Sequence, residues 1–340
     1  MGKQLELDGA AGDTYVSTGH LPPDELVQQL VAEAYQRFGP IDDGQVSTVY
    51  PVLAVVPGDL FGICVVGTSG SIYAVGHAER AFTIMSVSKP FVFALICELL
   101  GVEEARARLG VNATGMPFNS VTAMEYSRDA RTNPMVNSGA IATTSLVRGA
   151  NFADRWHFIE DGLSRFAGRR LSLNEEVYAS AAATNIRNRG IARLLESYGR
   201  IFMDPLEATD LYTRQCCLDV TATDLAVMGA TLADGGVNPV TGERVVAATS
   251  CKAALAVMAT AGLYETSGDW LYDIGLPGKS GIGGGIVTVS PGKGGLGTFS
   301  PLLDASGNSV RGQLVAKFLS EKLGLSLFAS QPETRGEAQR

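Results

Sequence analysis

The sequence predicts an α+β protein in which both ends of the chain build one domain and a helical domain is inserted between them. Two observations carry this prediction. Strand-like runs bounded by turn residues occur near the start of the chain and again near its end. The middle, from about Gly101 to Ala233, is instead rich in Ala, Leu and Arg and shows helical spacing. Such an order is typical of one mixed domain that is interrupted by an insertion.

The first part of the chain shows a helix followed by a hairpin. Residues 22–25 carry a Pro-Pro-Asp-Glu helix start, and an apolar helical stripe then continues until Gly39 and Pro40 end it. Residues 61–67 and 71–75 are typical of strands, and the Thr-Ser-Gly turn between them indicates a hairpin. A helix through Leu100 is expected next.

Alternating helices and loops are expected in the middle of the chain, and strands return after it. The predicted helices of the middle lie near 139–147, 154–167, 172–183, 190–200 and 222–233. The later elements are a helix at 252–262, strands at 270–274, 285–290 and 298–303, and an amphipathic helix at about 312–323. We therefore expect a catalytic domain from 22–93 plus 236–328, a helical domain over 94–235, and flexible tails at 1–21 and 329–340.

Composition excludes several classes of function. The net charge is −8 and no Lys/Arg cluster is visible, so no nucleic-acid partner is expected. No apolar run reaches the roughly 18 residues of a membrane span, and the N-terminus has no hydrophobic signal core. The odd count of five cysteines indicates free thiols in a reducing, cytoplasmic location. The three histidines lie far apart, so no metal site is expected.

Ser86 and Lys89 form the first candidate for chemistry. They lie three residues apart at the predicted start of a helix, so their side chains share one face. A buried, neutral amine beside a serine can accept its proton, which makes the serine a nucleophile. The alternative is that Ser86 caps the helix and Lys89 is solvated. A second Ser-x-x-Lys, from Ser290 to Lys293, contains Pro-Gly and is expected to be a turn.

Two glycine-rich segments follow near the C-terminus. Lys279-Ser280-Gly281 lies beside a predicted strand, where such a triplet lines the site opposite the Ser-x-x-Lys helix of penicillin-recognising enzymes. The alternative is a tight turn. Residues 292–297 match a dinucleotide-binding spacing, but no helix pattern follows them, so we interpret this segment as a loop.

Four further polar side chains are candidates for substrate contact. Asn137 precedes small residues at a helix start, where its carboxamide can either position a substrate or cap the helix. Asn188 follows Arg187 in a polar segment. Tyr212 and Tyr264 can relay protons near a Ser–Lys pair, although most tyrosines simply pack.

Taken together and in order, these segments resemble the serine-dependent glutaminases, a family with a β-lactamase-like catalytic domain whose antiparallel sheet is flanked by helices. The matching stretches are 85–89, 117–120, 133–140, 187–188, 210–216 and 275–286. They are collinear, and the resemblance covers about residues 25–325.

The resemblance implies hydrolysis of L-glutamine to L-glutamate and ammonia without metal or other cofactor. It implies that Ser86 is the nucleophile and Lys89 its base. Substrate-binding positions of the family fall on Asn137, Asn188, Tyr212, Tyr264 and Ile282, the last acting through its backbone. Lys279 joins them as a substrate-binding candidate, and both tyrosines are also catalytic candidates.

The chain departs from the family pattern at two positions. The family has a glutamate seven residues before the asparagine that matches Asn188, and this chain has Ala181 there. That carboxylate is expected to bind the charged end of the substrate. A tyrosine of the family is matched by Val49, and the adjacent Tyr50, if it lies on a strand, is expected to face the other side.

Two alternatives to a glutaminase stay open at this level. One is a related serine amidohydrolase that acts on another small amide, and the other is a non-catalytic relative that binds a small molecule. In each case we expect a homo-oligomer, dimer or tetramer, with a small-molecule ligand.

Overall fold

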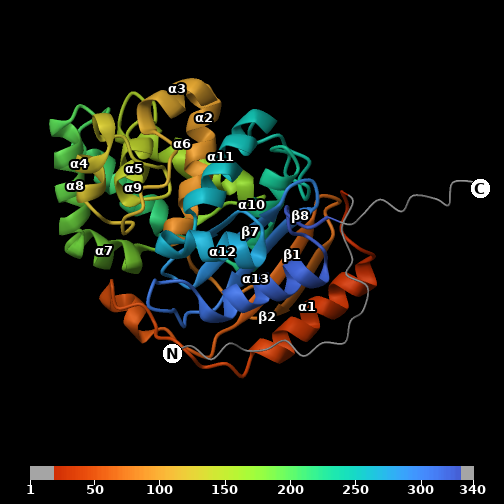
Figure 1. The fold of residues 1–340 in the computed structure, drawn as a ribbon. Coiled ribbons are helices and arrows are strands. Elements are labelled where there is room, and N and C mark those ends of the chain that lie inside the picture. The colour runs from red at the N-terminus through yellow and green to blue at the C-terminus, as the bar shows by residue number, and fades with distance from the viewer. Residues whose placement is uncertain (1–18, 331–340) are drawn as a thin grey trace, which may run out of the picture.

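The computed structural model describes residues 19–330, so most of the two predicted tails lies outside the described part of the chain. A five-stranded sheet forms the centre of one half of the molecule, and helices crowd the other half (Figure 1). The strand order is β2-β1-β8-β7-β6, and every neighbouring pair is antiparallel. The strands are β1 (Gly62–Gly67), β2 (Ile72–Gly76), β6 (Gly278–Ser280), β7 (Gly285–Ser290) and β8 (Gly294–Phe299).

The two ends of the chain share this sheet, as the sequence predicts. β1 and β2 form the expected hairpin, with Val65 opposite Tyr73. β1 pairs on its other side with β8, with Cys64 opposite Gly297. The mixed α+β architecture is therefore confirmed, because strands from residues 62–76 and 278–299 hydrogen-bond directly.

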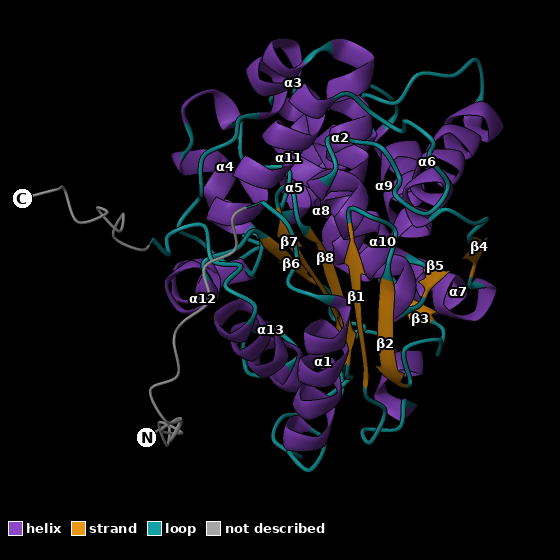
Figure 2. Ribbon diagram, turned by 90° about the vertical axis from the view of Figure 1, so that its right-hand side faces the viewer, coloured by secondary structure: helices purple, strands orange, loops and turns teal. Residues whose placement is uncertain are grey.

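Helices cover both faces of the sheet (Figure 2). α1 (Asp24–Phe38) and α13 (Val310–Lys322) pack together on one face, with α12 (Ser267–Ile274) beside α13. α10 (Ala222–Ala233) lies on the other face and contacts β1, β7 and β8. The sequence explains α1, since Val27, Leu30, Val31 and Ala34 recur at helical spacing and all are buried.

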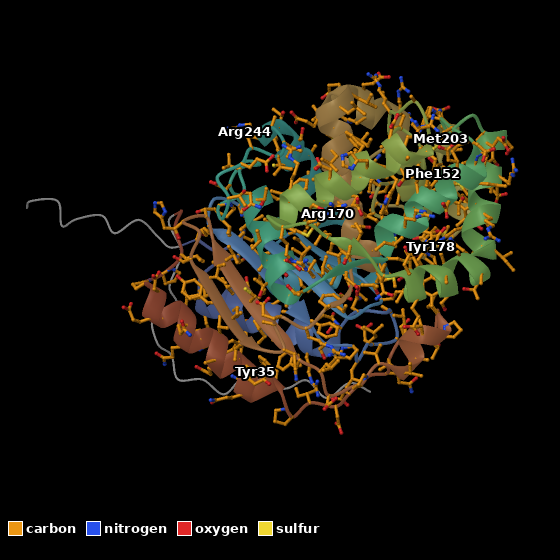
Figure 3. All side chains as sticks on the ribbon, turned by 180° about the vertical axis from the view of Figure 1, so that it is seen from behind. Tyr35, Phe152, Arg170, Tyr178, Met203 and Arg244 are labelled. Carbon is orange, nitrogen blue, oxygen red and sulfur yellow. The ribbon has the colours of Figure 1, made fainter. Side chains whose placement is uncertain are left out.

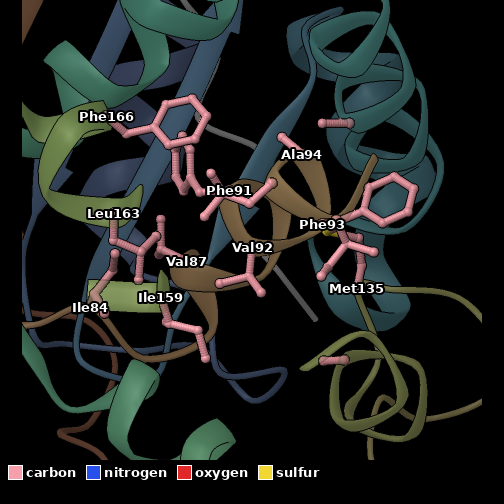
Figure 4. Packing of buried hydrophobic residues seen from close by; sticks show 14 of the residues in the cluster. Ile84, Val87, Phe91, Val92, Phe93, Ala94, Met135, Ile159, Leu163 and Phe166 are labelled. Atoms are coloured by element: carbon pink, nitrogen blue, oxygen red, sulfur yellow. The ribbon is translucent and has the colours of Figure 1, made fainter. Parts of the chain in front are cut away.

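The helical half is built around α2 (Ser88–Leu100). Every residue of α2 from Ser88 to Cys97 is buried. Phe91 of α2 packs against Phe166 of the helix α6 (Phe152–Ala167), as Figure 4 shows. Their ring centroids lie 5.1 Å apart. The other helices of this half are α3 (Val102–Leu109), α4 (Thr122–Tyr126), α5 (Asn137–Thr144), α6 (Phe152–Ala167), α7 (Glu175–Thr184), α8 (Ile186–Ser197), α9 (Pro205–Cys216) and α11 (Ala248–Ala261).

A second, small sheet lies at the start of the segment that carries Ser86. Its order is β3-β5-β4, from β3 (Phe82–Thr83), β5 (Leu218–Val220) and β4 (Ser172–Leu173). The pairing of β3 with β5 fixes the chain just before Ser86 against the end of α9. β4 also explains why the helix predicted at 172–183 begins only at Glu175.

Two sequence predictions near the C-terminus are wrong. The strand predicted at 270–274 is the end of α12, because Trp270 and Ile274, four residues apart, are both buried while Tyr272 is 92% exposed. Residues 294–299, interpreted in part as a loop, form β8, so the strand lies earlier than the predicted 298–303. Glycine is a weak strand former, so local sequence does not predict this strand. The glycine-rich segment forms a strand because α10 packs against it.

Glycine in β8 permits the close approach of α10. A Cβ at Gly297 would lie 2.0 Å from the carbonyl oxygen of Ala222. We expect Gly297→Ala to lower the free energy of unfolding by about 3 kcal/mol or more, because backbone rather than a flexible side chain must move. Chemical denaturation measures this change.

Gly190→Ala is the matched control, since no atom lies within 4 Å of that Cβ position on α8. It should be neutral or slightly stabilising, by up to about 1 kcal/mol. Equal stability of the two variants would contradict the packing argument.

The predicted boundaries place α10 in the helical domain, although it packs directly on the sheet. The division of the chain into domains stays a prediction. Over residues 19–330, no single helix is long and apolar enough to cross a membrane, and one helix pair that meets the length and composition criteria is bent by 119°.

Candidate active site

A pocket of about 180 Å³ lies where the Ser86 turn meets helices α5, α7, α8 and α9. Its walls include five of the eight predicted site residues: Ser86, Asn137, Asn188, Tyr212 and Ile282. They come from five different segments of the chain. The fold therefore brings together residues that are as far as 196 positions apart in sequence, from Ser86 to Ile282.

Ser86 lies in a 3-10 turn over Met85–Val87 that leads directly into α2. The residue before it, Met85, has a φ of +48°, which is uncommon for a side chain of this size. Such strain persists only where surrounding contacts enforce it, and it is frequent beside reactive groups. α2 begins at Ser88 with Val87 as its N-cap and no side-chain cap, so the helix-capping interpretation of Ser86 is wrong.

Lys89 is buried behind this turn, with only 1% of its surface exposed. Its Nζ donates to the carbonyl oxygen of Met135 at 3.2 Å and to Oδ1 of Asn137 at 2.8 Å. Burial lowers the pKa of Lys89 from 10.5 to about 8. The interpretation of Lys89 as a solvated residue is wrong, and a neutral amine is accessible near physiological pH.

Asn137 is the centre of a hydrogen-bond network across the pocket. Its Oδ1 accepts from Lys89 and, at 3.2 Å, from the hydroxyl of Tyr212. Its Nδ2 donates to Oδ1 of Asn188 at 3.1 Å. Because Val136 rather than Asn137 is the N-cap of α5, the alternative role as a cap is wrong. This network fixes the orientation of the carboxamide by using both of its ends.

Tyr264 and Lys279 are, with Lys89, the predicted site residues that do not line the pocket. The Tyr264 side chain hydrogen-bonds with Ser86, and its hydroxyl donates to the carbonyl oxygen of Ser280 at 3.2 Å. Burial raises the pKa of Tyr264, so its hydroxyl stays protonated. Tyr264 itself has a φ of +55°, the second strained residue beside the nucleophile.

Lys279, predicted to lie beside a strand, is itself on the short strand β6, and its amine is not part of the pocket wall. Its Nζ donates to the carbonyl oxygens of Gly262 at 2.8 Å and Ser280 at 2.6 Å. It also lies 4.4 Å from the centre of the Tyr264 ring. Burial, and then the neighbouring Lys89, lower the pKa of Lys279 well below its usual value. The structure thus places Lys279 behind Tyr264.

The expectation that Tyr50 faces away from the site is wrong. Tyr50 and Val49 both line the pocket. The segment is not a strand: it is a bend that precedes a 3-10 turn over Pro51–Val55. Strict alternation of side chains applies only to extended strands, so both neighbours can face one side. Burial raises the pKa of Tyr50.

Cys216 lines the pocket, although it is not among the predicted site residues. It lies four residues after Tyr212 on α9, so helical spacing was a signal that placed both on one face. Its sulfur lies 3.9 Å from Oγ of Ser88, and burial raises the pKa of the thiol. All five cysteines are free, as predicted.

Other sequence candidates lie outside this pocket. Ser290 ends β7 and its Oγ donates to the carbonyl oxygen of Leu325. Residues 291–293, including Lys293, form a turn, which confirms the second Ser-x-x-Lys as a turn. A larger cleft of about 460 Å³ contains Arg106 and Arg131 but none of the predicted site residues. Within the described part of the chain, no group of three or more His, Cys, Asp or Glu could hold a metal ion.

The comparisons with known proteins agree with this geometry. A sequence model of the family Glutaminase matches residues 44–328. The chain is 69% identical over 320 residues to "Glutaminase 2" of Yersinia pestis, covering 94% of both chains. It is 47% identical to the "Glutaminase" of Mycobacterium ulcerans, covering 89% of this chain and 94% of that one.

Solved structures show the same relationship in three dimensions. One is named probable glutaminase ybaS; it is 43% identical, covers 91% of this chain and all of that one, and gives a TM-score of 0.89. A Bacillus glutaminase is 30% identical, with a TM-score of 0.81 over 90% of this chain and all of that one. The β-lactamase-like fold expected from the motifs is thus confirmed. With its Ser86 pocket, its fold and this similarity over most of its length, the chain belongs to the glutaminase family of amidohydrolases.

Proposed function

We propose that the chain hydrolyses L-glutamine to L-glutamate and ammonia with Ser86 as nucleophile and Lys89 as its base. The observation that carries this proposal is the placement of Ser86 in the pocket wall, one helical turn before a lysine that is buried and has a pKa of about 8. A solved structure called Mglu in its glutamate form is 37% identical to this chain with a TM-score of 0.85. That relative holds the product that this proposal requires.

The reaction proceeds in two balanced steps. Oγ of Ser86 attacks the side-chain amide carbon while neutral Lys89 takes the hydroxyl proton, and the C–N bond then breaks as that proton passes to the departing nitrogen. Ammonia leaves and an acyl ester on Ser86 remains. Water then attacks the ester with Lys89 again as base, which releases the acid and restores the serine.

The negative oxygen that forms in each step needs hydrogen-bond donors. We assign this role to the backbone N–H groups of Ser86 and Ile282, which line the same pocket from different segments. Gly281 and Gly283 flank Ile282, and a Cβ at Gly283 would lie 2.6 Å from the carbonyl oxygen of Thr83. Glycine at 283 thus lets the turn lie close to the strand that leads to Ser86.

The remaining candidates position the reactants. Asn137 holds the Lys89 amine, and Tyr212 holds Asn137, so the base keeps one orientation. Asn188 and Tyr212 offer polar groups to the substrate from the far wall. Tyr264 hydrogen-bonds with Ser86 and serves as a proton relay to the leaving nitrogen.

The pKa of Lys89 gives a pH dependence for kcat/KM. The base must be neutral, so kcat/KM for glutamine should rise about tenfold per pH unit below pH 8 and level off above it. Initial rates of ammonia release between about pH 6 and 9 test this. A flat profile over that range would contradict Lys89 as the base.

Two further expectations are part of this proposal. We place the enzyme in the cytoplasm on the support of its five free cysteines. We also propose a homo-oligomer, dimer or tetramer, with exposed apolar side chains such as Val55 and Tyr272 available for contact. Light scattering of the purified chain tests the second expectation, and a monomer at micromolar concentration would refute it.

A further inference from the structure

The pocket beside Ser86 has no negative charge in its wall. None of the described residues that line it is Asp or Glu. On the α7 side the wall is uncharged: Thr184 lines it, and Ala181 is 1% exposed and packs in a cluster with Met85 and Cys217. Glutamine carries an α-ammonium as well as an α-carboxylate, and a buried ammonium without a counter-charge is costly.

Three oxygen acceptors near the pocket are engaged by the protein's own donors. Oδ1 of Asn137 accepts from Lys89 and Tyr212, and Oδ1 of Asn188 accepts from Asn137. The carbonyl oxygen of Asn119 accepts twice from Arg187. A substrate ammonium must compete with these donors, one of which is the Arg187 guanidinium.

One acidic residue of these helices, Asp210, is committed elsewhere. Asp210 on α9 accepts from the hydroxyl of Tyr178 and pairs with Arg214 at 3.1 Å. The Arg214 guanidinium in turn lies over the rings of Phe152 and Tyr178, both labelled in Figure 3. Asp210 therefore faces this cluster and is not among the pocket residues.

The one charged side chain among the described residues of the pocket wall is instead positive. It belongs to Arg187, whose guanidinium donates twice to the carbonyl oxygen of Asn119. This distribution attracts a substrate carboxylate and repels an ammonium.

We propose that this pocket selects primary amides that carry a carboxylate but no free α-ammonium, such as glutaramate or N-acylated glutamine, over glutamine itself. The inference rests on the proposed Ser86 amidohydrolase chemistry and names its substrate class. The bonds made and broken are unchanged: Oγ of Ser86 joins the amide carbon, ammonia leaves, and water releases the dicarboxylate.

The direct test compares three amides on the unmodified protein by ammonia release. The probes are L-glutamine, glutaramate and N-acetyl-L-glutamine. We expect kcat/KM for glutaramate to exceed that for glutamine by at least about tenfold, mainly through KM, because the two differ only by the ammonium. A kcat/KM for glutamine equal to or above that for glutaramate would overturn the inference and leave the proposed function intact.

A charge variant supplies the second measurement. Ala181→Glu introduces a carboxylate at the pocket wall and should shift the glutamine-to-glutaramate ratio of kcat/KM at least about tenfold toward glutamine. Ala183→Glu is the matched control, since Ala183 is exposed on the same helix outside the pocket and its ratio should stay within twofold. An unchanged ratio in a folded Ala181→Glu protein would contradict the inference. No ammonia from any of the three amides would refute the proposed function instead.

Discussion

Ser86→Ala should abolish ammonia release while leaving the fold unchanged. Removing the nucleophile of a covalent mechanism typically lowers kcat by about 10³-fold or more. Ser86 is partly exposed at the pocket wall, and alanine fits its position, so the melting temperature should stay the same. Steady-state kinetics at saturating amide, with thermal unfolding of the same preparation, measure both effects.

Ser290→Ala is the control for this substitution. Ser290 belongs to the other Ser-x-x-Lys of the chain, and its Oγ bonds only weakly, at 3.4 Å, to the carbonyl oxygen of Leu325. It should keep kcat/KM within twofold. If Ser86→Ala retained more than a tenth of the activity, Ser86 would not be the nucleophile.

Lys89→Met should lower kcat by about 10²- to 10⁴-fold, the usual contribution of a general base. The same variant should be as stable as the parent protein or more stable. Methionine fills a similar volume without the buried amine, whose burial lowers its pKa from 10.5 to about 8. A variant that loses activity but keeps or gains stability would show that Lys89 has a chemical role rather than a structural one.

The sign of the stability effect follows from proton linkage. Between pH 8 and 10.5 the unfolded state binds more protons at Lys89 than the folded state, so stability rises with pH over that window. Below pH 8 both states are protonated, and the buried ammonium destabilises the fold. The Lys89→Met variant should therefore lose this pH dependence.

Lys252→Met provides the matched control, because Lys252 is exposed on α11. Its activity and stability should stay close to those of the parent. A large fall in the melting temperature of Lys89→Met, together with the loss of activity, would indicate that Lys89 mainly holds Met135 and Asn137 in place.

The sequence predicted the elements whose signals are local. The stripe of α1, the hairpin of β1 and β2 and the helix α10 appear where apolar spacing and turn residues place them. It failed at α12 and β8, where the deciding contacts lie elsewhere in the chain. A helix over 267–274 forms because Trp270 and Ile274 share a buried face, and glycine-rich β8 forms because α10 packs against it.

The same division holds for the site. The order of motifs along the chain identified Ser86, Lys89, Asn137, Asn188 and Tyr212, which the structure brings together. Their mutual hydrogen bonds were not predictable, since they join residues 48 to 75 positions apart in sequence. Tyr50 was misplaced because its orientation depends on a bend that periodicity does not describe.

By itself the sequence determined the residue types available for chemistry, their order along the chain and the family resemblance they form. Only the tertiary structure decided that Lys89 is buried, that Asn137 orients it, and that no described residue of the pocket wall carries a negative charge. The physical reason is that burial and electrostatic surroundings depend on neighbours from distant segments. The pKa of a lysine and the charge of a pocket are properties of the packed chain.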